Sequence, residues 1–382
     1  MADVSLPVGG TSGGLGLRNR FRRWRIGKIS SPDFQRWAAR NPLTRRRARR
    51  EAEKLHHLVS GFVYSQVLLA CVELELFQTL RSGPQSAEAL ALRYGMSPDR
   101  MRTLCQSAAA LGLLVRLKDE SYDLGDLGAA AIGVPGLDEM IRHHRVFYQD
   151  LGDPVALMRG ETDPELARFW AYVRSPDVDP ATAERYSRLM ASSQDLVAEE
   201  TLDSLDLNGI AHLADVGGGT GRFLGHVARR HPALRLTLMD LPGVIDAARP
   251  LLVEAGLDTR IRCHPGSFLD DPMPRDADAI SLVRVLYDHD DTTVSRLLAR
   301  VFEALPPGGR VIISEPMSGG ATPSPAGDAY FGFYTMAMTT GQSRSAERHR
   351  ALLTEAGFGN IRKVPTARPF LTGVLMAIKP AG

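Results

Sequence analysis

A glycine-rich turn within residues 213–232, LADVGGGTGRFLGHVARRHP, constrains the fold more than any other stretch of the chain. Gly217, Gly219 and Gly221 lie between an apolar run and a segment with helical spacing. Because glycine has no side chain, such a turn can bend tightly and approach a ligand closely. A dinucleotide-binding fingerprint has glycines at positions one, three and six, but position six counted from Gly217 is Arg222. The pattern therefore disfavours a dehydrogenase.

Two carboxylates accompany this turn. Asp215 directly precedes the glycines, and Asp240 ends the next apolar run. A carboxylate at the end of the second strand can accept both hydroxyls of a ribose. The competing role for Asp240 is to cap the helical segment that follows it. The sequence thus indicates a nucleoside site and leaves that alternative open.

The C-terminal half predicts a parallel sheet with crossover helices, because short apolar runs alternate with helical segments from about residue 211. The last two runs are close enough in sequence to pair antiparallel. The predicted strands are 212–219, 234–240, 261–268, 278–286, 310–316, 359–367 and 372–380.

Upstream, two helical segments and a hairpin form a winged-helix pattern. Ser86 and Ser97-Pro98 begin the helices, Gly95 ends the first, and the polar turn 118–121 joins two apolar segments. The pattern is compatible with DNA binding through the second helix. That helix offers few polar groups, so a structural or dimerising module is favoured; these groups are Arg100, Arg102 and Gln106.

The N-terminal region is strongly basic. Residues 18–54 hold fourteen Lys and Arg against three acids, together with Trp24 and Trp37, two of the three tryptophans. Basic residues mixed with amphipathic aromatics suit an anionic membrane surface or nucleic-acid phosphates, and a solvated tail is the remaining alternative. No uninterrupted run of eighteen apolar residues predicts a membrane span, no signal peptide is evident, and three scattered cysteines favour a cytoplasmic protein without a disulfide framework.

The segment LVRVLYDHDD (282–291) ends an apolar run in a polar cluster. His289 titrates in the range of a general base, whereas a tyrosine such as Tyr287 is a poor base at neutral pH but a good hydrogen-bond partner for a hydroxyl. Asp290 and Asp291 suit the start of the next helix. A metal site is disfavoured, because successive residues point in different directions.

Taken together, DVGGGTG, the Asp before LPGVI, GSF, LVRVLYDHDD and LPPGGRVIISEP resemble the S-adenosylmethionine-dependent O-methyltransferases of the plant caffeate and bacterial small-molecule type. The resemblance implies an α/β fold with a C-terminal, Rossmann-like, seven-stranded methyltransferase sheet and an N-terminal, all-α, winged-helix-like dimerisation domain. It implies a homodimer that binds no nucleic acid. The expected divisions are a basic tail (1–50), the dimerisation and substrate-wall domain (51–195) and the cofactor-binding domain (196–382).

The resemblance also implies S-adenosyl-L-methionine as cofactor, S-adenosyl-L-homocysteine as product, and no metal. The cofactor-binding residues expected from it are Asp215, Gly217, Gly219, Gly221, Asp240, Leu241, Ser267, Phe268, Arg284 and Ser192. Ser267 departs from the aspartate that is usual there.

The catalytic positions depart from the family pattern. The usual strand end carries a histidine base, whose place is taken here by Tyr287, while His289 takes the place of a tryptophan. Ser343 replaces an acidic residue, and Glu315 is retained. The expected catalytic residues are therefore His289 as base, Tyr287 as substrate-orienting group, and Glu315.

A narrower resemblance is to the bacterial carotenoid O-methyltransferases, which methylate the 1-hydroxyl of acyclic hydroxycarotenoids such as demethylspheroidene or hydroxyneurosporene. It rests on LVRVLYDHDD, FQRWAARNPLTRRRARR, GFVYSQVLLACVELELF and EPMSGG…AGDAYFGFYTMAMTTGQSRS. It implies an apolar tunnel for a polyene and peripheral contact of residues 18–50 with the cytoplasmic face of the inner, photosynthetic membrane. The expected substrate-binding residues are Met190, Phe331, Tyr334, Met338 and His144. Alternatives are a bacteriochlorophyllide or other tetrapyrrole, a quinone, a polyketide phenol, or a DNA-binding regulator that senses the cofactor.

Overall fold

The computed structural model describes residues 16–171 and 194–381, with the side chains of 169–171 excepted. The chain divides into two compact units, residues 1–68 and 69–382, and each is described by itself. The division falls inside a long helix, α3 (Arg45–Glu73). The boundaries expected after residues 50 and 195 stay predictions.

The first unit contains α1 (Leu17–Ile29), α2 (Pro32–Arg40) and most of α3. Ala38 is the single buried residue among 16–68. Trp24 and Trp37 are 59% and 52% exposed, and each packs on a phenylalanine of its own helix. The described part of the basic segment is thus helical, with its aromatic rings on the surface.

Helix α3 is long and apolar enough to cross a membrane by length and composition, with 11% of its most apolar window buried. The sequence expectation was drawn from uninterrupted apolar runs, and polar residues interrupt the apolar ones in this helix, so that expectation did not single it out. A helix that packs against a partner subunit can also be this long and this apolar, so these two properties do not distinguish it from a membrane span. Its exposed apolar residues are Leu55, Leu58, Val59, Phe62 and Val63.

The second unit begins with the predicted winged-helix pattern. Ser86 and Ser97 each accept a hydrogen bond from a backbone N–H of the helix they start, and Gly95 ends the first helix with φ +64°. Both caps and the hairpin are confirmed. The elements are α4 (Leu76–Leu80), α5 (Ala87–Tyr94), α6 (Pro98–Ala110), β1 (Leu114–Arg116), β2 (Tyr122–Leu124) and α7 (Asp126–Gly133).

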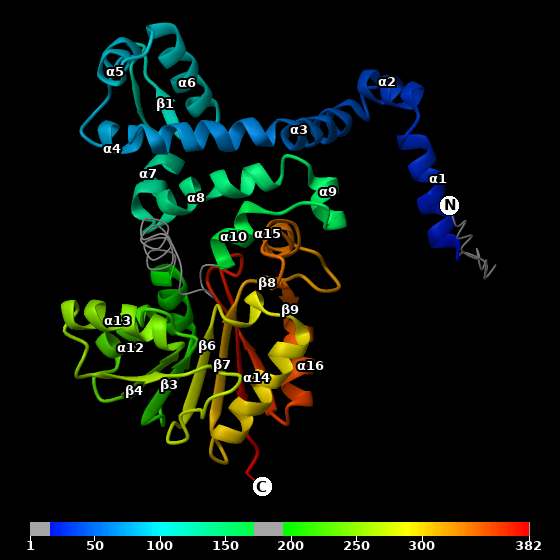
Figure 1. Cartoon of the computed structure of the whole chain (residues 1–382). Helices are drawn as coiled ribbons and strands as arrows, with labels where there is room; N and C mark the ends of the chain where they lie inside the picture. The colour runs from blue at the N-terminus through cyan, green and yellow to red at the C-terminus, as the bar shows by residue number, and fades with distance from the viewer. Residues whose placement is uncertain (1–15, 172–193, 382) are drawn as a thin grey trace. The chain divides into compact units, whose positions relative to one another are not determined.

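A seven-stranded sheet forms the C-terminal part, as predicted (Figure 1). Its order is β10-β11-β7-β6-β3-β4-β5; the five consecutive strands from β7 to β5 pair in parallel, and β11 joins β7 antiparallel. The strands are β3 (His212–Val216), β4 (Arg235–Asp240), β5 (Ile261–Pro265), β6 (Ala279–Val283), β7 (Arg310–Glu315), β10 (Gly359–Val364) and β11 (Gly373–Ile378). Several of them end earlier than predicted, because the last residues of the apolar runs form the loops at the sheet edge.

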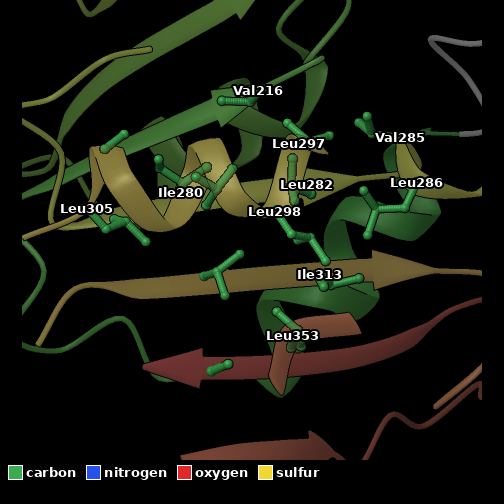
Figure 2. Close-up of a cluster of buried hydrophobic side chains, with 14 of the residues drawn as sticks. Val216, Ile280, Leu282, Val285, Leu286, Leu297, Leu298, Leu305, Ile313 and Leu353 are labelled. Atoms are coloured by element: carbon green, nitrogen blue, oxygen red, sulfur yellow. The ribbon is translucent and has the colours of Figure 1, made fainter. Parts of the chain in front are cut away.

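Helices bury both faces of this sheet. On one face α14 (Asp291–Ala304) and α16 (Ala346–Glu355) enclose a cluster around Ile280, Leu298 and Ile313 (Figure 2). On the other face α12 (Arg222–Arg230), α13 (Pro242–Glu254) and a helical segment at 194–204 pack against strand residues such as Leu213 and Leu236. Each face therefore contributes its own apolar core, which fixes the strand ends rigidly.

A group of helices lies at the carboxyl ends of the central strands (Figure 1). Tyr287, just after β6, is buried in one cluster with residues of these helices, including Phe147 and Tyr334. The elements are α8 (Leu137–Asp150), α9 (Pro154–Arg159), α10 (Glu165–Ala171), η3 (Pro325–Tyr330) and α15 (Phe331–Ala337), with the short strands β8 (Met317–Ser318) and β9 (Arg344–Ser345) beside them.

Candidate functional site

The candidate site lies where β3, β4, β5 and β6 end side by side. The chain runs outward from β3 through β4 to β5, and β6 lies on the other side of β3. In open α/β sheets ligands bind outside the carboxyl ends of the strands at such a switch point. The predicted cofactor residues within the described part of the chain lie at or just after these four strand ends.

The glycine turn adopts the conformation that the sequence predicts. Gly217, Gly219 and Gly221 have φ of +69°, +59° and +78°, values that favour glycine. A Cβ on Gly217 would lie 2.8 Å from Cγ2 of Val285, whereas a Cβ on Gly219 would meet nothing within 4 Å. The turn is thus packed on one side and open at Gly219.

Asp240 links the glycine turn to the end of β4. Its Oδ2 accepts the N–H of Gly219 at 2.8 Å, and its Oδ1 accepts the N–H of Leu241 at 2.7 Å. A carboxylate has about four acceptor sites, so capacity for ribose hydroxyls remains. Leu241, whose N–H donates to this carboxylate, is itself exposed.

Asp215 is buried below the glycine turn. Its Oδ1 accepts the hydroxyl of Ser281 at 2.6 Å, while Oδ2 has no hydrogen-bond partner among the described residues. Burial raises the pKa of Asp215 to about 7. A buried acceptor with spare capacity fits a site for a cationic ligand, because a nearby positive charge would offset the cost of burying the carboxylate.

Ser267 and Phe268 follow β5. The Ser267 N–H donates to Asp271 Oδ2 at 2.7 Å, and its hydroxyl donates to Asp270 Oδ2 at 3.3 Å. The ring of His289 packs edge-on against Phe268, with centroids 5.4 Å apart. His289, the base expected from the sequence, therefore lies beside the residue expected at the adenine.

Tyr287 and Arg284 mark the end of β6. Tyr287 is 2% exposed, and the Arg284 guanidinium donates to its hydroxyl at 3.3 Å. Burial raises the pKa of Tyr287 well above its usual range, although Arg284 opposes this. The side chain is thus a neutral phenol at physiological pH, suited to hydrogen bonding and unable to act as a phenolate base.

Glu315, the last residue of β7, is fully buried. Its Oε1 accepts the backbone N–H groups of Val285 and Leu286 at 2.8 and 2.7 Å, and its Oε2 has no partner among the described residues. Burial raises the pKa of Glu315 to about 8. The carboxyl oxygen thus holds the backbone of the turn after β6.

The raised pKa of Glu315 predicts a pH-dependent stability. A carboxyl whose pKa is higher in the folded protein stabilises it fully below the unfolded pKa of about 4.3 and loses that contribution as pH rises through about 8. We expect Glu315→Gln to remove this part of the slope, so that the variant gains free energy of unfolding relative to the parent between pH 5 and pH 8. Urea unfolding across that interval measures the difference, and parallel curves would contradict the prediction.

Arg344 also holds the turn after β6. Its guanidinium, 0% exposed, donates to the carbonyls of Leu286 and His289 and to Asp291 at 2.6–2.7 Å. Asp290 caps α14 through the N–H of Thr293, as predicted. Ser343, in the place of an acidic residue, donates instead to the carbonyl of Gly327.

Two histidines of α8 face the aromatic residues of η3 and α15. His143 Nε2 lies 2.8 Å from the Tyr334 hydroxyl, and His144 Nε2 lies 2.7 Å from the Tyr330 hydroxyl. Phe147 packs edge-on against both tyrosine rings. Sequence reasoning singled out His144 but not His143, which was missing from the expected site. The adjacent HH dipeptide was the available signal.

The expected substrate residues fall in different places. Tyr334 and Met338 are buried in the cluster that contains Tyr287, and Phe331 is partly buried beside Tyr330. Met190 and Ser192 lie outside the described residues. Within the described ranges, no group of three or more His, Cys, Asp or Glu is placed to hold a metal ion.

Comparisons with known proteins agree with this geometry. An O-methyltransferase domain model matches residues 148–359, and an O-methyltransferase dimerisation domain model matches residues 56–131. The chain is 52% identical to demethylspheroidene O-methyltransferase of Cereibacter sphaeroides over 97% of each protein, and 51% identical to the enzyme of that name from Rhodobacter capsulatus over 88% of this chain and 85% of that one. The apo structure of the S-adenosylmethionine-dependent methyltransferase SibL superposes with a TM-score of 0.75 at 26% identity, covering 86% of this chain and 99% of that one.

Proposed function

The chain belongs to the O-methyltransferases that join a dimerisation domain to a methyltransferase domain, and from this premise we propose that it methylates the 1-hydroxyl of an acyclic hydroxycarotenoid with S-adenosylmethionine. The observation that carries the substrate class is the likeness, over nearly the whole chain, to a demethylspheroidene O-methyltransferase. At the position of the family's histidine base this chain has a tyrosine that stays neutral. This agrees with an alcohol acceptor, because an alcohol hardly ionises in the ground state and a base at that position would therefore do little to ionise it before the transfer.

The residues at the strand ends fit S-adenosylmethionine. The open face of Gly219 would lie under its methionine part, Asp240 would bind the ribose, and Ser267 with Phe268 would flank the adenine. The spare acceptor of Asp215 suits the positive charge of the ligand. The cofactor supplies a methyl group that its own sulfonium charge has already activated.

The protein's own task is then to hold the acceptor oxygen in line with that methyl group. Orientation of two reactants supplies a large part of the rate acceleration in such transfers. Tyr287 and Arg284 present polar groups at the end of β6, among apolar and aromatic side chains such as Tyr334 and Met338. Met and aromatic residues suit a slender, irregular apolar ligand, so a polyene would bind here with only its hydroxyl end in polar contact.

An acceptor assay tests the proposal. Purified protein, methyl-labelled S-adenosylmethionine and vesicles or detergent are incubated with a 1-hydroxycarotenoid, a bacteriochlorophyllide, a quinone or a catechol. We expect label on the carotenoid. Label on another acceptor alone would overturn the proposed substrate class, while methyl transfer itself would stand. Binding of the cofactor without any labelled product would contradict the proposed function.

A homodimer follows from the dimerisation domain at residues 56–131. The exposed apolar residues of α3 that fall in this domain, such as Leu58, Phe62 and Val63, form the surface that a second copy would cover.

We also propose that the basic segment 18–50 binds the cytoplasmic face of an anionic membrane, where a polyene would dissolve. Helices α1 and α2 expose Trp24, Trp37 and many arginines, and each Lys or Arg near an anionic surface contributes about 1 kcal/mol.

A vesicle assay tests this contact. Removal of residues 1–44, which ends just before α3, is expected to weaken binding to phosphatidylserine vesicles by more than about tenfold at low salt. Added salt should weaken the binding of the full chain to these vesicles in the same way, and phosphatidylcholine vesicles serve as the control. Equal binding of both proteins would contradict the contact.

A further inference from the structure

We propose that His143, acting through the Tyr334 hydroxyl, receives the proton that the acceptor alcohol loses as it is methylated. This inference rests on the proposed transfer of a methyl group to a hydroxyl.

The geometry begins at the end of β6. Tyr287 and Tyr334 are buried in the same cluster, and both Tyr334 and His143 are close enough to Arg284, at the end of β6, to interact with its charge. The acceptor oxygen is expected at this strand end. From there the Tyr334 hydroxyl bonds His143 Nε2 at 2.8 Å. A hydroxyl can accept one hydrogen bond and donate another, so Tyr334 can connect an alcohol at the strand end to the imidazole on α8.

The other candidate groups are less suited to take this proton. The Tyr287 phenol stays neutral because burial raises its pKa. The His289 ring packs edge-on against Phe268, the residue expected at the adenine. Burial raises the pKa of Glu315 to about 8, so this group is already protonated at physiological pH, and its Oε1 holds two backbone N–H groups.

The protonation state of His143 agrees with an acceptor role. Burial, with His144 and Arg284 nearby, lowers the pKa of His143 to about 4, so the ring is neutral at physiological pH. Such a weak base is sufficient here, because an alcohol oxygen that gains a methyl group becomes far more acidic than an imidazolium. A ring that was already protonated could not accept.

The step balances in atoms and charge. The alcohol oxygen forms a bond to the methyl carbon as the bond from that carbon to sulfur breaks, and its electrons leave the sulfur neutral as a thioether. The hydroxyl proton moves to Tyr334 Oη, and the proton of Tyr334 moves to His143 Nε2. The positive charge of the sulfonium is thereby transferred to the imidazole, and the product is a neutral methyl ether.

The test uses the full-length enzyme with whichever acceptor the parent methylates. His143→Gln can keep a hydrogen bond to Tyr334 but cannot take a proton, so we expect kcat to fall about a hundredfold with KM changed less than about threefold. We expect Tyr334→Phe to lower kcat by a similar factor. The kcat of the double variant should be no lower than that of either single variant, because the two residues act in one path. Product binding by calorimetry and the unfolding midpoint of His143→Gln should stay at parental values.

The neighbouring pair provides the comparison. His144→Gln breaks the Tyr330 contact on the same helix, and we expect it to alter KM with kcat within about threefold of the parent. Parental kcat in His143→Gln, multiplicative losses in the double variant, or an equal loss of kcat in His144→Gln would each overturn the assignment. An error in the proposed carotenoid substrate can be told apart from these outcomes, since the parent enzyme would then not methylate the carotenoid, before any variant is made.

Discussion

Replacing Gly217 with alanine is expected to lower the affinity for S-adenosylmethionine about a hundredfold, which corresponds to about 2.7 kcal/mol. Two costs combine at this position. A side chain at φ +69° costs about 1–3 kcal/mol, and its Cβ would lie 2.8 Å from Val285 Cγ2. The turn can relieve both only by moving, and movement displaces the Gly219 N–H from Asp240.

Calorimetric titration with cofactor or product measures this effect. Gly27→Ala is the matched control, because Gly27 lies within α1 and a Cβ there meets nothing within 4 Å. It should bind like the parent. Affinity of Gly217→Ala within about threefold of the parent would mean that the glycine turn does not contact the cofactor.

Replacing Arg344 with methionine is expected to destabilise the fold by about 3–5 kcal/mol, because it leaves a buried set of acceptors without their donor. Its guanidinium serves three backbone carbonyls and Asp291 at once, and it is fully excluded from solvent. Methionine fills much of the volume, so the loss reports hydrogen bonding more than packing. The unfolding midpoint should fall by on the order of 10 °C.

Arg348 offers the control for this experiment. It bonds the other oxygen of the same Asp291, but its side chain is 42% exposed. Arg348→Met should therefore cost less than about 1 kcal/mol. Equal losses in the two variants would contradict the argument that burial, and not the ion pair itself, makes Arg344 critical.

Much of the fold was predictable because local signals and the global fold agree. Ser86 and Ser97 cap helices through their own side chains, and the seven apolar runs all became strands. The break between α3 and α4 was not predicted: Glu75 adopts φ +49°, which nothing in the apolar stretch around it signals. Strand ends were extended too far for a similar reason, since apolar residues such as Val285 and Leu286 continue the pattern into the turn.

The placement of candidate residues was predictable where they lie at or just after strand ends, as with Asp240 and Phe268, while their contact with a cofactor stays a prediction. It was not predictable where contacts span the chain. His143 and Tyr334 are 191 residues apart, and no local pattern states which face of α8 meets α15. Glu315 was expected in the site, but its hydrogen bonds to backbone groups, like those of Arg344, depend on the tertiary fold.

The turn after β6 also bears on how enzymes of this architecture could diversify. Five backbone groups hold it: the N–H groups of Val285 and Leu286 and the carbonyls of Leu286, Tyr287 and His289. None of these bonds uses the side chain at position 287. Selection could therefore exchange that side chain, and with it the chemistry offered to the acceptor, without first having to rebuild the loop that presents it.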